Sequence, residues 1–152
     1  MVLEYLKLIE TKVNLGMSLD SSINIEFDNL IDNFCKKERI WIKKLVEFEL
    51  NYLEVMGFAI DLSECALTGT KDSLDWVSPK SGRAVNSKAG KRWSKKLLKL
   101  PPFLLDKKID ADKNDLIDGL NLTGHFLKKQ IYSDLNKDLP SSRKKIIDSL
   151  KN

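Results

Sequence analysis

The chain has 152 residues, of which 42% are hydrophobic and 32% charged, so it can build one domain with one core and is neither disordered nor fibrous in composition. No apolar run approaches the roughly 20 residues that span a bilayer. Residues 1–10 lack the basic region followed by an apolar region that a signal peptide has. Two cysteines, Cys35 and Cys65, are too few for a disulfide framework, which favours a cytoplasmic protein with reduced thiols.

The first third of the chain predicts three helices. Apolar residues recur at helical spacing over residues 2–15 and again over residues 21–34, where Asp20 supplies an N-cap. The third stripe, Trp41–Val55, is the widest and stops before Gly57. So wide an apolar face predicts a central helix that packs on more than one side.

The middle of the chain predicts a small β-hairpin inserted into the helical protein. Leu74–Val77 has the composition of a short strand, Ser78–Gly82 has turn residues, and Arg83–Asn86 fits a return strand. Lys88–Leu98 predicts a short helix. The two prolines at 101 and 102 end that helix and impose an extended link.

Helical periodicity returns near Asp112 and continues to Ile131, and a last short helix begins at Ser141. Aspartates crowd the start of the first of these helices, which suits the positive end of a helix dipole. The predicted fold is therefore mainly α, a helical bundle with a small inserted hairpin, in a single domain over residues 1–152.

Residues for catalysis or metal binding are scarce. His125 stands alone within a helical pattern, which is more typical of a packing residue. Residues 68–71 read Thr-Gly-Thr-Lys but lack the strand and leading glycine of a phosphate loop. Neither cysteine has a partner at zinc-ligand spacing, and Cys35 fits a small buried side chain on a helix. Three aspartates suggest a cation site, but helix capping and solubility explain them more simply: Asp110, Asp112 and Asp118. We expect the protein not to be an enzyme and to bind no cofactor or metal.

The net charge of +4 is unevenly distributed. The segment Trp76–Leu105 contains no Asp or Glu, so all 22 acidic residues lie outside it. Its eight cations are Lys80, Arg83, Lys88, Lys91, Arg92, Lys95, Lys96 and Lys99. Such a run can be a solvated face, but its length, its lack of acids and its interspersed aromatics favour an anionic partner.

The aromatic residues of this segment allow two interpretations. Cations that neutralise phosphates give affinity, and aromatic side chains stack on unpaired bases, which is a role open to Trp76 and Trp93. Alternatively, Trp93 and Phe103 anchor an irregular segment to the core. For Phe103, which follows two prolines, we favour the core.

Five blocks of sequence together resemble the C-terminal region of the bacterial RecO family. They are Cys-Ala-Leu-Thr-Gly at 65–69, Trp-Val-Ser-Pro-Lys-Ser-Gly-Arg-Ala-Val at 76–85, Ala-Gly at 89–90, Leu-Pro-Pro-Phe-Leu-Leu at 100–105 and Leu-Thr-Gly-His-Phe-Leu at 122–127. The resemblance covers nearly the whole chain, and the block at 76–85 is its most specific part.

The resemblance implies a non-enzymatic recombination mediator. It implies binding and annealing of single-stranded DNA, partnership with RecR and single-stranded DNA-binding protein, and indirect help to RecA during RecF-pathway gap repair. Such a protein would be cytoplasmic, associated with the nucleoid and free of any membrane. The family begins with an OB-fold whose β-rich pattern is absent from this sequence, so the chain resembles a fragment or shortened form with weaker DNA binding.

The resemblance also concerns zinc, because some members of the family hold the metal with two cysteine pairs. Cys65 fits the first ligand, whereas Thr68 stands at the position of its partner and no cysteine follows in the hairpin. The insert at about residues 62–90 would then be zinc-ribbon-like and free of metal.

Two functions remain open for the basic segment. In the leading hypothesis its residues contact the phosphates of single-stranded DNA, chiefly through Arg83, Lys88, Lys91, Arg92, Lys95 and Lys96. In the alternative, the same cations dock the acidic tail of single-stranded DNA-binding protein, or RecR, by binding carboxylates. Both can hold, with the ligands competing. An enzyme is disfavoured because the sequence shows no recognisable catalytic nucleophile with a general base beside it.

Overall fold

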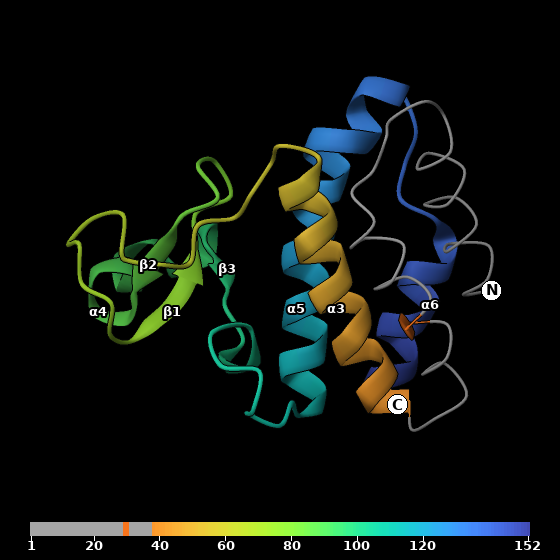
Figure 1. The fold of residues 1–152 in the computed structure, drawn as a ribbon, viewed down its shortest axis with the longest axis horizontal. Coiled ribbons are helices and arrows are strands. Elements are labelled where there is room, and N and C mark those ends of the chain that lie inside the picture. The colour runs from red at the N-terminus through yellow and green to blue at the C-terminus, as the bar shows by residue number, and fades with distance from the viewer. Residues whose placement is uncertain (1–28, 31–37) are drawn as a thin grey trace.

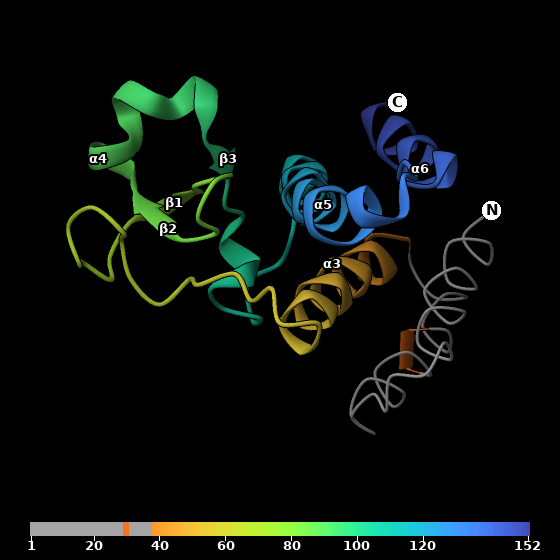
Figure 2. The same cartoon turned by 90° about the horizontal axis from the view of Figure 1, so that it is seen from above.

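The computed structural model describes residues 29–30 and 38–152, and it places helices at one end of the molecule and a small sheet at the other (Figure 1). The helical end contains α3 (Glu38–Val55), α5 (Lys113–Leu127) and α6 (Ser141–Lys151). Helix α5 contacts both α3 and α6 (Figure 2). This arrangement confirms the predicted mainly α fold with a small β insert.

The core lies where α3 meets α5. The apolar stripe of α3 buries side chains such as Trp41, Leu45 and Leu53, each at most 4% exposed, so the predicted helix and its apolar face are confirmed. Gly119 of α5 allows the two helices to approach closely. A Cβ atom at that position would lie 3.0 Å from Val46 Cγ1 of α3 and 3.2 Å from the Phe103 ring.

A capping box starts α5, as the crowding of aspartates there suggested. The Asp112 carboxylate accepts a hydrogen bond from the Asp115 amide at 2.8 Å, and the Asp115 carboxylate accepts one from the Asp112 amide at 3.1 Å. The helix continues into a π-helical turn at Lys128–Tyr132 and a 3₁₀ turn at Ser133–Leu135. Asn136, at φ +50°, then ends the run in the left-handed region.

The sheet has three antiparallel strands in the order β2–β1–β3: β1 (Leu74–Val77), β2 (Ala84–Asn86) and β3 (Leu98–Lys99). Strands β1 and β2 form the predicted hairpin. Gly82, at φ +68°, closes its turn, and the Gly82 amide donates to the Ser78 carbonyl at 2.9 Å.

The prediction of one helix over Lys88–Leu98 was wrong in detail. The segment contains α4 (Ser87–Gly90) and the 3₁₀ helix η1 (Lys91–Lys96), after which Leu98 enters β3. The backbone becomes extended at Leu97 because the next two residues pair with β1, Leu98 with Val77 and Lys99 with Trp76. Sheet pairing outweighs the helical propensity of a Lys- and Leu-rich sequence.

Two of the predicted helices, over residues 2–15 and 21–34, lie outside the described residues, apart from Asn29 and Leu30, which are helical. The prediction for Cys35 also lies outside them. Within the described ranges, no helix combines the length and the apolar character that crossing a membrane requires.

Candidate nucleic-acid interface

The sheet meets α5 through strand β3 and through the β1–β2 hairpin turn. His125 Nε2 lies 3.2 Å from the Pro79 carbonyl oxygen, and Lys129 Nζ donates to the carbonyls of Pro79 and Lys80 at 3.0 and 3.1 Å. The Phe126 ring packs against Gly82, where an added Cβ would lie 3.6 Å away. The sequence blocks at 76–85 and 122–127 therefore meet in space, and His125 has a structural role there.

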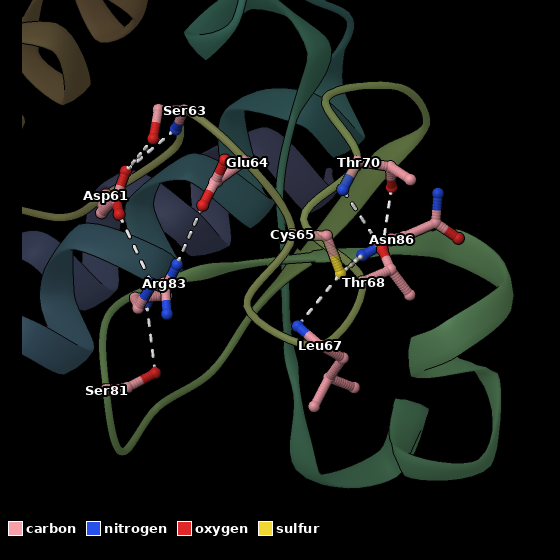
Figure 3. Close-up of polar contacts among 10 residues, drawn as sticks. All are labelled: Asp61, Ser63, Glu64, Cys65, Leu67, Thr68, Thr70, Ser81, Arg83 and Asn86. Carbon is pink, nitrogen blue, oxygen red and sulfur yellow. Dashed lines mark hydrogen bonds and ion pairs between the residues drawn. The ribbon is translucent and has the colours of Figure 1, made fainter.

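Cys65 joins the loop before β1 to the end of β2. Its Sγ atom accepts hydrogen bonds from the Leu67 amide at 3.4 Å and from the Asn86 amide at 3.2 Å (Figure 3). The loop is closed on itself, since the Cys65 amide donates to the Thr70 carbonyl at 2.7 Å. A single buried sulfur atom, 1% exposed, thus connects segments 21 residues apart.

Hydrogen bonding also changes the acidity of this thiol. Burial opposes ionisation of Cys65, but hydrogen bonds from the Thr68 side chain and from the amides of Asn86, Leu67 and Thr68 together outweigh it. The pKa of Cys65 is lowered from 9.0 to about 7.

The residues around Cys65 do not fit the zinc site that some members of the family have. Cys65 is the only cysteine in the described part of the chain, and the Thr68 hydroxyl lies 2.9 Å from that of Thr70. No three His, Cys, Asp or Glu side chains of residues 29–30 and 38–152 are grouped to hold a metal ion.

Asn86 carries this connection into the basic segment. Its side-chain oxygen caps α4 by accepting from the amides of Lys88 and Ala89 at 2.9 and 3.4 Å, and its side-chain nitrogen donates to the Asp72 carbonyl at 2.8 Å. Gly90 then packs against Trp76, since an added Cβ would lie 2.7 Å from Trp76 Cδ1. These contacts fix the direction in which η1 leaves the sheet.

The outer side of α4 and η1 forms an open depression of about 660 Å³, which we call the Trp93 patch. Trp93 is 48% exposed and Leu67 is 63% exposed, and the Arg92 guanidinium carbon lies 6.0 Å from the centre of the Trp93 ring. The patch is lined by Leu67, Lys88, Ala89, Lys91, Arg92 and Trp93. Phe103, in contrast, is fully buried in the core, as predicted.

Five of the eight predicted cations lie on α4 and η1. All are exposed, and none forms an ion pair with any residue of the described part: Lys88, Lys91, Arg92, Lys95 and Lys96. The first three line the Trp93 patch. Lys95 lies beside a neighbouring depression of about 460 Å³ that also includes Trp76.

The other three predicted cations have different surroundings. Arg83 lies between two carboxylates, 3.4 Å from Asp61 and 3.6 Å from Glu64 (Figure 3). Lys99 pairs with Asp118 at 3.8 Å. Lys80 is exposed on the hairpin turn, where its carbonyl accepts from Lys129.

Sequence reasoning missed Leu67 as a surface residue of the patch. The one available signal was that a large apolar residue directly precedes Thr-Gly-Thr, a sequence typical of an exposed loop. Its proximity to Trp93 depends on the hydrogen bonds to Cys65 and could not be read from the spacing.

The fold and this surface define a helical domain with an inserted three-stranded sheet that presents a cationic patch around an exposed indole. Residues 25–139 match the protein family described as Recombination protein O C terminal. The chain belongs to the RecO family.

Several relatives support this assignment. The DNA repair protein RecO of Phenylobacterium zucineum is 46% identical over 111 residues, which cover 73% of this chain and 46% of the relative. That of Caulobacter vibrioides is 44% identical with the same coverage, and that of Bartonella tribocorum is 49% identical over 68% of this chain and 42% of its own. The chain thus spans less than half the length of these relatives. No solved structure matches it significantly.

Proposed function

We propose that the chain is a non-enzymatic component of DNA repair and recombination that binds single-stranded DNA through the cations of α4 and η1. The observation that carries this proposal is the group of five exposed cations on α4 and η1, unpaired with any described residue, three of which line the depression that contains the exposed Trp93. Cations of this kind neutralise phosphates and release counterions, and aromatic side chains add stacking on unpaired bases.

Membership of the RecO family supports the cellular setting of the proposal. The relatives are named as DNA repair proteins. We infer that the chain acts at the nucleoid in RecF-pathway gap repair, with RecR and single-stranded DNA-binding protein as partners and RecA loading as the outcome.

A second candidate function is docking of the acidic tail of single-stranded DNA-binding protein. The exposed Leu67 beside Trp93 favours it, since an apolar surface with cations at its edge also suits an acidic peptide that ends in an aromatic residue. Titration of an acidic peptide ending in Phe distinguishes the two. Peptide binding without DNA binding would favour docking, and DNA binding without peptide binding would exclude it.

The principal experiment measures affinity for a labelled single-stranded oligonucleotide by fluorescence anisotropy at several salt concentrations. Replacing Lys91, Arg92, Lys95 and Lys96 by Glu should weaken binding by about tenfold or more, and the wild-type affinity should fall steeply with salt. The control variant makes the same change of charge at four exposed lysines elsewhere, Lys113, Lys137, Lys144 and Lys145. A flat salt response, or equal losses in the two variants, would contradict the proposal.

A further inference from the structure

We propose that the Trp93 indole, with Leu67 beside it, is a stacking platform for one unpaired base of single-stranded DNA, whose neighbouring phosphates lie on Lys88, Lys91 and Arg92. This inference rests on the proposed function and assigns the base-contacting part of that surface.

The exposure of Trp93 is the first observation. Of the three tryptophans, Trp41 is buried at 4% exposure and Trp76 is partly buried between the sheet and Gly90, whereas Trp93 is 48% exposed. Leu67, at 63%, lines the same depression. Two large apolar side chains from segments far apart in sequence are thus gathered at one open site, which marks a binding surface more than chance exposure does.

The second observation is that the platform is held in place before any ligand binds. The Cys65 sulfur ties the Leu67 loop to Asn86, and Asn86 caps the helix that leads to Trp93. Gly90 is wedged against Trp76 and Leu97, where an added Cβ would lie 2.7 and 3.0 Å away. A surface ordered in advance loses less conformational entropy on binding, which favours affinity.

The third observation is the order of charges around the indole. Lys88 and Lys91 precede Trp93 along the chain, and the Arg92 guanidinium lies 6.0 Å from its ring centre, so cations border the platform. A single strand offers a flat base beside each phosphate, which matches this alternation. Duplex DNA keeps its bases stacked internally, so it offers no free base to the indole.

The experiment compares two oligonucleotides of equal length and charge, one of thymidines and one with a fully abasic backbone. The wild type should prefer the thymidine strand. Trp93→Ala should lose roughly 5- to 100-fold in affinity for that strand, with its affinity for the abasic strand unchanged. Trp93→Phe should keep most of the preference but lose the quenching of tryptophan fluorescence on binding.

Controls separate this inference from the proposed function. Leu105→Ala removes another exposed apolar side chain, 46% exposed, and should bind both strands as the wild type does. If Trp93→Ala equals the wild type on both strands while the Lys91, Arg92, Lys95 and Lys96 variant loses binding, the platform is wrong and the proposed function stands. If the wild type binds neither strand, the proposed function itself fails. Trp93-dependent binding of an acidic peptide, with DNA affinity independent of Trp93, would also overturn the platform.

Discussion

At the scale of single residues, the buried Cys65 holds a structural position between the loop before β1 and the end of β2. Its sulfur accepts amide hydrogen bonds from Leu67 and Asn86 and so connects two loops, which is what a metal ion does through its ligands in a zinc ribbon. The resemblance alone predicted the loss of the ligand at Thr68. It did not predict that the remaining thiol would become the acceptor at the centre of the module.

Replacement of Cys65 by Ala should therefore lower the free energy of unfolding by about 1–3 kcal/mol, because two amides lose their acceptor. Cys65→Ser should recover part of this loss, since a hydroxyl accepts hydrogen bonds. Urea denaturation of the three proteins at pH 6.5 measures the effect. Equal stability of the Ala variant and the wild type would contradict the role of the sulfur.

The stability contributed by Cys65 should also depend on pH. Its folded-state pKa of about 7 lies below the ordinary value of 9.0, so the folded state loses the proton first. The advantage of wild type over Cys65→Ala should be largest above pH 9, decline from there towards pH 7, and lose its ionisation-dependent part below pH 7. Denaturation of both proteins between pH 6 and 9.5 measures the difference, and Cys65→Ser, which does not titrate, provides the control. A difference that is constant with pH would contradict ionisation of Cys65.

A second residue-scale feature is the buried pair of Glu49 and Arg143. The two guanidinium nitrogens of Arg143 bind the two carboxylate oxygens of Glu49, one of them at 2.9 Å, and Arg143 also donates to the Leu120 carbonyl. Thr123 donates to Glu49 at 2.5 Å. Gly124 makes room for Arg143, because an added Cβ would lie 2.8 Å from Nε. The network joins α3, α5 and α6.

Replacing only one member of this pair should strongly lower the stability of the protein. Arg143→Met leaves the Glu49 carboxylate buried at 0% exposure without its cation and should lower stability by roughly 3–5 kcal/mol. The double variant Glu49→Gln with Arg143→Met should be more stable than Arg143→Met alone, because neither charge of this pair remains. A double-mutant cycle by thermal or chemical denaturation measures the coupling, and additive losses would contradict it.

At the scale of elements, strand β3 contacts α5 directly, and a few polar contacts also hold the β1–β2 hairpin turn against α5 and the turn that follows it. Lys129 donates to the carbonyls of Pro79 and Lys80, and His125 contacts Pro79. Lys129 is exposed on the π-helical turn that follows α5. The contacts of Lys129 therefore hold the outer side of the hairpin turn. The packing of the Phe126 ring against Gly82 is a separate, apolar contact of the same turn.

We expect Lys129→Ala to loosen the turn while leaving the helical core intact. The loss of global stability should be about 1 kcal/mol, because each of these hydrogen bonds is exposed to solvent. Amide hydrogen exchange at residues 78–83 should accelerate, with the amides of α3 unchanged. Lys128→Ala, at the adjacent position, serves as the control, since Lys128 pairs with Asp138 instead. Uniform acceleration across the protein would contradict a local role.

The elements also show what sequence alone could predict. Strong periodicity predicted α3 and α5, and turn residues predicted the β1–β2 hairpin. The prediction for Lys88–Leu98 was wrong in detail because its last residue, Leu98, pairs with β1, a contact that no local pattern records. The sequence likewise predicted only part of the candidate site. An acid-free segment identified the cations, but the ion pairs of Arg83 and Lys99 come from Asp61, Glu64 and Asp118, all outside that segment.

At the scale of the whole molecule, α4 and η1, which carry five of the predicted cations, lie with the sheet at the end away from α6 (Figures 1 and 2). A polyanion that binds there need not approach the carboxylates of the helical end. In the described part of the chain, Arg83 and Lys99 have carboxylate partners within 4 Å, and Lys80 lies apart from α4 and η1 on the hairpin turn. The electrostatic contribution to binding should therefore come from five positions and not from eight.

This division can be tested through the salt dependence of binding to single-stranded DNA. For single strands the logarithm of affinity falls with the logarithm of salt concentration by about 0.7 for each phosphate neutralised, so five cations give a slope of roughly −3.5. Alanine at Lys88 or Lys91 should each make the slope shallower by about 0.7. Alanine at Lys99 should change it by less than half as much, because Asp118 lies 3.8 Å away and already offsets its charge. Equal changes at all three lysines would show that Lys99 exchanges its carboxylate partner for a phosphate. The DNA interface would then include the paired cations of the basic segment as well as the unpaired ones.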